Sequence, residues 1–419
     1  MLFNRRFYLQ KLINAQGNGM VKIITGIRRC GKSYLLFNIF RKYLLDNGIT
    51  DDHIISISLD DLHADSLLNP KKLLSYIESN VHDDKQKYYV IIDEIQLVPQ
   101  FVELLLTLMH HPQLEVYVSG SNSKFLSSDV VTEFRGRGWE IRIHPLSFAE
   151  YYESAGGDKM EALQTYYTYG GLPQVYSLPT DEEKENYLKN LYETTYLRDV
   201  IQRNHLQNEG GMRQLTQILA SNIGASTNPK RISNTFDSVS DIAIKETTID
   251  RYIQHLQDAF IINESMRYNV KGRKYIGTEN KYFFEDIGLR NAIINFRQTE
   301  FNHIMENVIY NELRMRGYSV DVGMVEVYEK GENNKTIRKK LEVDFVVNKG
   351  SKRIYIQSAY ALPDAEKVQQ EQRSLLNIPD SFQKIIITGD YRRSNFNEEG
   401  VLFIGIFDFL LDINSVTKL

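Results

Sequence analysis

The chain has 419 residues, which is long for a single hydrophobic core and predicts two or three domains. Its formal net charge of -4 excludes a positive field over the whole surface, so nucleic-acid binding would need a local basic patch. The single cysteine, Cys30, excludes a disulfide framework, and the lack of a signal peptide or a membrane-length apolar run indicates a cytoplasmic protein with no membrane partner.

The first informative stretch is VKIITGIRRCGKSYLL, residues 21–36. Within it, GIRRCGKS fits the G-x-x-x-x-G-K-[ST] pattern of a phosphate-binding loop, between a β-branched strand and a helix. In such a loop the backbone N–H groups face the phosphates, Lys32 reaches the β- and γ-phosphates, and the Ser33 hydroxyl ligates Mg²⁺. The expected nucleotide contacts are Gly26, Ile27, Arg28, Arg29, Cys30, Gly31, Lys32, Ser33 and Tyr34.

A second apolar run, YYVIIDEIQ at residues 88–96, ends in Asp93 and Glu94. In a Walker B motif the aspartate holds Mg²⁺ through water, and the glutamate orients or deprotonates the water that attacks the phosphate. Such a pair can also be a solvated strand end. Because it follows a phosphate-binding loop, we interpret Asp93 as a metal-holding residue and Glu94 as the catalytic base.

Two further candidates come after this run. Asn122, or Ser121, follows a strand at Glu115–Ser119 and is typical of a polar sensor of the γ-phosphate, although GSN also forms turns. Arg137, like Arg135, lies just before a strand and is a candidate for stabilising charge in the transition state. A surface arginine is the alternative interpretation.

A strand at Ile54–Leu59 separates the two Walker motifs. The alternation of strands and helices predicts an α/β fold, with a doubly wound parallel sheet of the P-loop NTPase type and helices on both faces.

The phosphate loop, DEIQ, GSNS, PLSF-E, GGLP and YLRDVIQR occur in this order. Together they resemble a bacterial and archaeal family of AAA-type P-loop ATPases, over essentially the whole chain. The resemblance implies ATP and Mg²⁺ as cofactors, and a C-terminal region with a winged helix and a PD-(D/E)XK nuclease-like fold. The implied domains are an ATPase domain at 1–150, a helical lid at 151–211, a winged helix at 212–300 and a nuclease-like domain at 301–419.

The segment expected to form the winged helix has an amphipathic pair of helices followed by the basic hairpin RYNVKGRKYIG. Arg251 lies on the second helix, which would enter the major groove of DNA, and Lys271, Arg273 and Lys274 lie in the wing. These four residues are candidate DNA contacts. Winged helices also serve as packing and protein-interaction modules, so a protein partner is the alternative.

The C-terminal segment carries the acidic residues of a nuclease-like site in incomplete form. Asp344 takes the position of the first metal-binding aspartate, and Glu306 adds an acidic residue on the preceding helix. On the next strand Gln357 replaces the usual glutamate, and Ala359 replaces the lysine. We therefore expect a vestigial site in a domain kept for scaffolding or nucleic-acid binding. A different α/β fold with coincidental acidic residues is an alternative.

The sequence thus predicts an AAA-type ATPase that hydrolyses ATP with Mg²⁺ and couples nucleotide state to a DNA or protein partner. One alternative is a nucleotide-gated switch with slow hydrolysis. Another is an ATP-dependent nuclease in which a displaced lysine, such as Lys352 or Lys367, completes the second site. The oligomeric state is left open.

Overall fold

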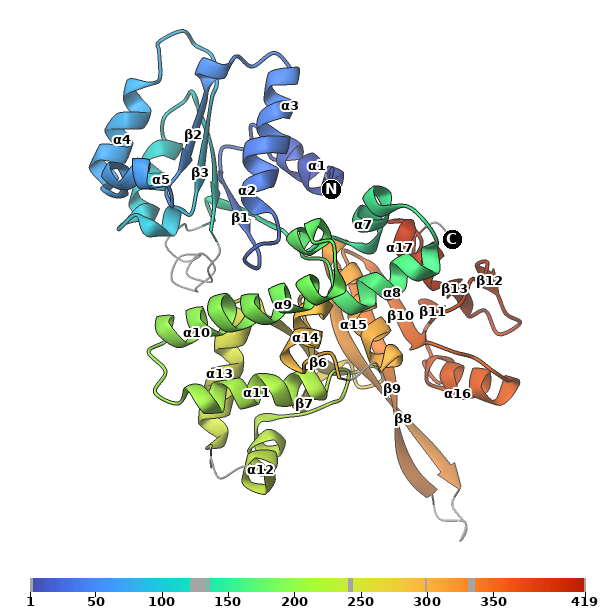
Figure 1. Ribbon diagram of the computed structural model, residues 1–419. Coiled ribbons are helices and arrows are strands. Elements are labelled where there is room, and N and C mark those ends of the chain that lie inside the picture. The colour runs from blue at the N-terminus through green and yellow to red at the C-terminus, as the bar shows by residue number, and fades with distance from the viewer. Residues whose placement is uncertain are drawn as a thin grey trace. The chain divides into compact units, whose positions relative to one another are not determined.

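The computed structural model describes residues 3–120, 134, 136–239, 244–297, 300–330 and 336–417. The chain divides into two compact units (Figure 1). Unit 1 comprises Met1–Pro145, Leu172–Gln174 and Asp258–Phe260, and unit 2 comprises Leu146–Gly171, Val175–Gln257 and Ile261–Leu419.

Unit 1 is built on a five-stranded parallel sheet in the order β2-β3-β4-β1-β5. Its strands are β1 (Val21–Thr25), β2 (Ile54–Ser58), β3 (Tyr88–Asp93), β4 (Leu114–Ser119) and β5 (Gly138–Arg142). The central strands are rich in Ile, Val and Tyr and buried on both faces, which requires helices on both sides of the sheet. The predicted doubly wound parallel sheet is confirmed, and β4 separates the strands that end in the two Walker motifs.

Helices cover the two faces of this sheet (Figure 1). One face is covered by α4 (Pro70–Ser79) and α5 (Phe101–Met109), whose Leu73 and Leu105 share a core with Val90 and Val116. The other face is covered by α1 (Arg6–Asn14) and by the continuous run of α2 (Lys32–Tyr34), the π-helical η1 (Leu35–Phe40) and α3 (Arg41–Asp46). Short 3₁₀ turns complete the unit at η2 (Asp51–His53), η3 (Leu62–Leu68) and η4 (Ile95–Leu97).

Unit 2 begins with a helical section. Capping boxes formed by Ser147 with Glu150 and by Thr180 with Glu183 start two of its helices, because each pair satisfies backbone N–H groups at a helix N-terminus. The elements are α7 (Phe148–Ala155), α8 (Lys159–Tyr169), η6 (Pro173–Ser177), α9 (Asp181–Leu191), η7 (Tyr192–Leu197), α10 (Arg198–Arg203), α11 (Glu209–Ser221), α12 (Pro229–Val239), α13 (Glu246–Asp258) and α14 (Ile287–Ile293).

The rest of unit 2 is an eight-stranded sheet in the order β12-β13-β11-β10-β9-β8-β6-β7. Its strands are β6 (Ile262–Asn269), β7 (Lys274–Phe284), β8 (Ser319–Lys330), β9 (Thr336–Lys349), β10 (Lys352–Ala359), β11 (Gln383–Thr388), β12 (Asn395–Phe396) and β13 (Leu402–Gly405). The helices of this part are α15 (Phe301–Met315), α16 (Ala365–Leu376) and α17 (Ile406–Leu411).

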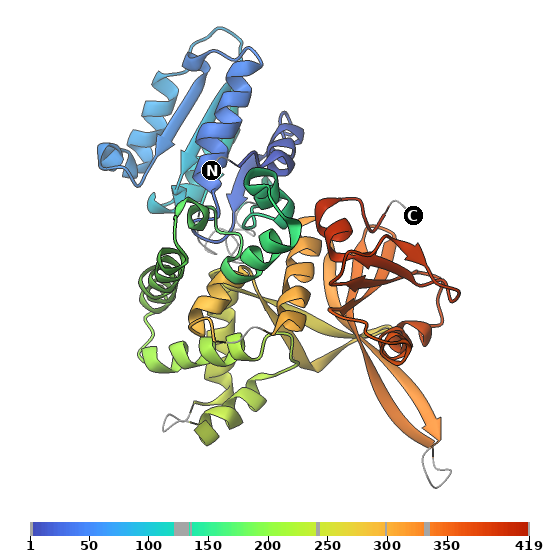
Figure 2. The same ribbon diagram turned by 45° about the vertical axis from the view of Figure 1, so that its right-hand side comes forward.

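Two hairpins of this sheet matter for function. The β6–β7 hairpin follows α11, α12 and α13, and it joins the sheet because β6 pairs in parallel with β8. At the tip of this hairpin Lys271 donates to the carbonyl of Glu326 on β8 at 2.8 Å. Strands β8 and β9 extend beyond the sheet as a long projecting hairpin (Figure 2). In the described part of the chain, no helix is both long and apolar enough to cross a bilayer.

Candidate active site

The phosphate loop follows β1 and depends on a glycine at its first position. Gly26 has a φ of 140°, and a Cβ atom there would lie 2.1 Å from the carbonyl oxygen of Ile143. Only glycine permits this close approach of two backbone segments. Cys30 is fully buried, and its thiol donates to the same carbonyl at 3.6 Å. This contact gives Cys30 a structural place in the loop.

Lys32 stands at the first position of α2, and its side chain turns back over the loop. The ammonium donates to the carbonyl oxygens of Gly26 and Ile27 at 3.0 Å each, and only 5% of the residue is exposed. Both acceptors are neutral. A phosphate oxygen can therefore replace either carbonyl as the acceptor and gain a charge-assisted hydrogen bond.

Asp93 ends β3, is 3% exposed, and accepts hydrogen bonds from the hydroxyls of Ser119 and Ser33. Burial raises the pKa of Asp93, whereas these hydrogen bonds and the charge of Lys32 lower it. The structure thus brings together Ser33 and Asp93, the two residues predicted to hold Mg²⁺.

Ser119 is a site residue that the sequence analysis missed. Its position at the carboxyl end of β4 could have identified it. Val118 pairs with Ile92, so the next residues along the two strands, Ser119 and Asp93, lie at the same level. Adjacent parallel strands that end at the same level bring their last side chains together. The predicted sensor Asn122 lies outside the described residues.

Glu94 follows Asp93 in a left-handed backbone conformation, with a φ of 54°. Its carboxylate accepts a hydrogen bond from the side-chain amide of Gln96. Glu94 is half-buried, and its charge is one of the influences that raise the pKa of Asp93.

Arg28, Arg29 and Tyr34 belong to the predicted nucleotide contacts and lie at the surface of the loop and of the helix that follows it. Arg28 is half-buried, whereas Arg29 and Tyr34 are exposed. Arg29 also has a left-handed backbone, with a φ of 64°. These side chains are therefore accessible to a bound nucleotide, unlike Ile27 and Cys30, which are buried.

Arg137 is not brought to the loop. Its carbonyl accepts from the N–H of Val21, at the start of β1, whereas the loop begins after the other end of this strand. Four residue steps of parallel strand correspond to roughly 13 Å. Within one chain the candidate transition-state role of Arg137 therefore disagrees with its position. Arg142, which pairs with Thr25 at the far end of the strands, lies at the edge where the loop starts.

The side chains at the phosphate loop include oxygen donors of the kind that Mg²⁺ prefers. Among the described residues, no three His, Cys, Asp or Glu side chains are grouped as an all-protein metal site would need. Mg²⁺ at a phosphate loop does not need such a group, since it takes one hydroxyl, one carboxylate, waters and phosphate oxygens. Ser33 and Asp93 fit this role.

Of the acidic residues expected at the second site, Glu306 contacts a lysine that the sequence analysis missed, and Asp344 lies near enough to act on this lysine electrostatically. Lys281 on β7 contacts Glu306 at 2.8 Å and Glu342 at 2.7 Å. Lys352 begins β10, and Lys367 pairs with Glu371 at 2.6 Å, so the structure provides Lys281 in place of both proposed lysines. The available signal was a charged residue inside the otherwise apolar end of a strand.

Asp344 and Gln357 lie beside this group. Asp344 accepts from the N–H of Ser358 at 2.7 Å, and its own N–H donates to the Gln357 side-chain oxygen at 3.4 Å. Burial, followed by the charge of Glu306, raises the pKa of Asp344 well above its ordinary value. The amide of Gln357 donates to Glu371 on α16 at 3.3 Å.

The candidate DNA contacts are all exposed and belong to two elements: Arg251 lies on α13, and Lys271, Arg273 and Lys274 lie at the β6–β7 turn. Lys274 also acts electrostatically on Glu326 of β8, together with Lys340 of β9. Basic side chains of the β6–β7 turn and of the projecting hairpin therefore share one region of unit 2.

Comparison with known proteins agrees with the geometry of unit 1. Residues 18–152 match the family model of an AAA domain, and residues 160–300 match that of a domain of unknown function. An uncharacterised protein of Haemophilus influenzae is 31% identical over 416 residues, covering 98% of this chain and 99% of that protein. An uncharacterised protein of Methanocaldococcus jannaschii is 26% identical over 366 residues, covering 84% of this chain and 77% of that protein.

Among solved structures, the ORC1 protein of Aeropyrum pernix in complex with DNA aligns with 13% identity and a TM-score of 0.29, over 70% of this chain and 93% of that one. A likeness at this level carries no argument about fold or function.

The parallel sheet, the phosphate loop and the adjacent carboxylates define an AAA-type P-loop ATPase domain. The chain belongs to the same family as the Haemophilus influenzae protein, which it matches along almost its entire length.

Proposed function

We propose that unit 1 binds ATP with Mg²⁺ and hydrolyses it. The observation that supports this most directly is the meeting of Ser33 and Asp93 beside the ammonium of Lys32. A hydroxyl, a buried carboxylate and a buried cation with neutral partners are the groups that a nucleotide triphosphate and its metal require.

In this mechanism Lys32 exchanges the carbonyls of Gly26 and Ile27 for phosphate oxygens, and backbone N–H groups of the loop bind the remaining oxygens. Ser33 and Asp93 would hold Mg²⁺, which neutralises charge on the β- and γ-phosphates when it is bound. Glu94 takes the proton of the attacking water.

A substitution of Glu94 tests its proposed role as the catalytic base. Glu94→Gln keeps the size of the side chain and its contact with Gln96 but removes the basic oxygen, so we expect ATP affinity to stay within about 3-fold while the hydrolysis rate falls by at least about 100-fold. Glu103→Gln on the exposed surface of α5 is the matched control, with no change in either quantity. Hydrolysis at the wild-type rate in Glu94→Gln would refute the role of Glu94.

A second proposal concerns DNA. Helices α11, α12 and α13 and the β6–β7 hairpin follow the order of a winged helix, and the basic residues of the hairpin lie beside those of the projecting β8–β9 hairpin. Basic residues of both hairpins act on Glu326 of β8. A hydrogen bond from Arg338 and the charges of Lys340 and Lys274 lower the pKa of Glu326. An exposed basic region formed by two β-hairpins suits the phosphate backbone of a duplex.

Anisotropy titrations of a labelled DNA duplex test this second proposal. Lys274→Ala combined with Lys340→Ala should weaken binding and reduce the slope of log affinity against log salt by about 2, since each lysine accounts for about one released counterion. Lys159→Ala, an exposed lysine at the start of α8, is the control. Unchanged affinity and slope in the double variant would favour a protein partner for this surface.

A further inference from the structure

We propose that the acidic centre of unit 2 is a cation site whose cation is the chain's own Lys281, so that no divalent metal binds there. The centre consists of Glu306 on α15, Glu342 and Asp344 on β9, and Lys281 on β7. It includes Glu306 and Asp344, two of the residues from which the sequence predicts a vestigial nuclease site.

The ammonium occupies the point where the carboxylates of Glu306 and Glu342 converge. Its nitrogen lies 2.8 Å from an oxygen of Glu306 and 2.7 Å from an oxygen of Glu342. Lys281 is 3% exposed, so water does not compete for these contacts. A divalent ion bound by the same oxygens would need to lie about 2.0–2.6 Å from each of them. This position overlaps that of the ammonium nitrogen.

The remaining contacts of the carboxylates also disfavour a metal. The second oxygen of Glu342 pairs with the guanidinium of Arg267 at 2.8 Å, and one oxygen of Asp344 accepts the backbone N–H of Ser358. The charges of Glu306 and Glu342 are met by those of Lys281 and Arg267.

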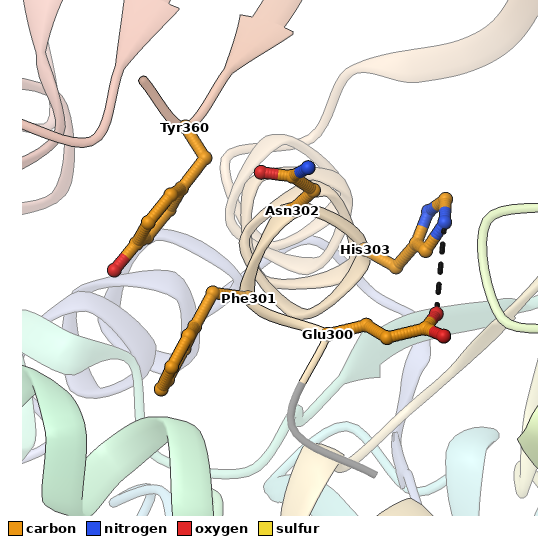
Figure 3. A pocket seen from close by; sticks show the side chains of 5 residues that line it. All are labelled: Glu300, Phe301, Asn302, His303 and Tyr360. Atoms are coloured by element: carbon orange, nitrogen blue, oxygen red, sulfur yellow. Dashed lines mark ion pairs between the residues drawn. The ribbon is translucent and has the colours of Figure 1, made fainter.

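The centre also lies next to a surface pocket. His303, 3.7 Å from Glu306, lines a cavity of about 350 Å³ together with Glu300, Phe301, Asn302 and Tyr360. Figure 3 shows His303 turned towards Glu300, with the rings of Phe301 and Tyr360 on the other side of the helix. His303 therefore lies between the buried Glu306 and the cavity.

The centre then has a structural role in place of a catalytic one. Lys281 connects β7, at the edge of the sheet, with β9 and with α15, three elements that are separated along the chain. The acidic residues hold the β6–β7 hairpin to the sheet and to α15. Because the ammonium fills the site, no metal binds there to activate a water for phosphodiester cleavage.

Mn²⁺ binding to the full chain, measured by electron paramagnetic resonance, tests the proposal. All variants carry Asp93→Asn so that an ion at the phosphate loop is not counted. We expect Lys281→Met to bind one more Mn²⁺ per chain than the parent, and Asp344→Asn added to it to remove that ion. Mn²⁺ should also raise the melting temperature of Lys281→Met but not that of the parent.

A second comparison holds even if Lys281→Met does not fold. Asp344→Asn alone, in a chain with Lys281 intact, should leave Mn²⁺ stoichiometry unchanged. Loss of an ion in this variant would overturn the proposal. Plasmid cleavage by the wild-type chain in Mn²⁺, abolished by both Asp344→Asn and Lys281→Met, would also overturn it and make Lys281 a catalytic lysine. A folded Lys281→Met that gains no ion would show that the carboxylates do not form a cation site.

Discussion

Lys32 in unit 1 and Lys281 in unit 2 are both buried but have opposite electrostatic surroundings. Lys32 in the phosphate loop donates to two backbone carbonyls, whereas Lys281 in unit 2 donates to two carboxylates. Both are almost inaccessible to water, at 5% and 3% exposure. Burial alone therefore does not decide what a lysine does.

The difference lies in the charge of the acceptors. A buried ammonium whose hydrogen-bond acceptors are neutral carbonyls has lost hydration without a direct ion pair to replace it, so it favours an anionic ligand. An ammonium between two carboxylates is already compensated, and its removal leaves buried negative charge. Lys32 should therefore contribute mainly to ligand binding, and Lys281 mainly to the stability of the fold.

Lys32→Ala should have the largest effect. It removes charge-assisted hydrogen bonds to phosphate worth about 3 kcal/mol, so ATP affinity should fall by about 100-fold or more and hydrolysis should be lost. The melting temperature without nucleotide should change little, because only bonds to neutral carbonyls are lost in the folded chain. Calorimetric titration with ATP and a thermal melt measure the two quantities. A large loss of stability with ATP affinity retained would reverse the assignment.

Lys281→Met should show the opposite pattern. Breaking a buried ion pair by removing one partner costs about 3–5 kcal/mol, so the free energy of unfolding of unit 2 should fall by this amount. ATP affinity should remain at the wild-type value. Urea denaturation measures the first effect and calorimetry the second.

A second substitution, at an acidic partner of Lys281, provides the control for Lys281→Met. Adding Glu306→Gln to Lys281→Met should recover part of the stability, since one uncompensated buried charge is then removed. Additive losses in the double variant would show that the two residues are not coupled.

These two lysines also show what the sequence can and cannot predict. Lys32 belongs to a local motif whose spacing is set by a single loop, so the sequence identified it together with Ser33, and the strand before Asp93 was equally clear. Lys281 meets Glu306 and Glu342 only through the order of strands in the sheet, which separates β7 from β9 by two other strands. No local pattern encodes that convergence.

Asp286 extends the comparison to a buried anion with neutral partners. It accepts from the N–H groups of Gly171 at 2.7 Å and Leu289 at 2.9 Å, and burial raises its pKa from 3.8 to about 6. Between about pH 4 and 6 the folded state holds the proton more strongly than the unfolded state, so stability falls as pH rises through this range. The fall should approach 3 kcal/mol, from about 2 pKa units at 1.36 kcal/mol each.

Asp286→Asn removes this titration while retaining a residue that caps α14 well. Urea denaturation at pH 4.5 and pH 7 should show wild type losing more stability than the variant between the two values. Parallel pH dependences of the two proteins would mean that Asp286 ionises in the folded chain as it does in water.

Ser119→Ala should give the smallest effect and tests why Lys32 remains available to phosphate. Asp93 is the acidic residue of the phosphate site, and it is held by the hydroxyls of Ser119 and Ser33 instead of by the ammonium. Removing one hydroxyl costs about 1 kcal/mol and leaves a buried carboxylate with fewer donors, so the pKa of Asp93 should rise further. We expect the Mg²⁺ concentration that half-saturates hydrolysis to increase about 5-fold, while Ser119→Thr, which keeps the hydroxyl, stays near wild type. Ser119→Ala could instead weaken ATP binding as strongly as Lys32→Ala. That result would mean that Asp93, without the Ser119 hydroxyl, pairs with Lys32. The hydroxyl of Ser119 would then be the group that keeps the Lys32 ammonium available to phosphate.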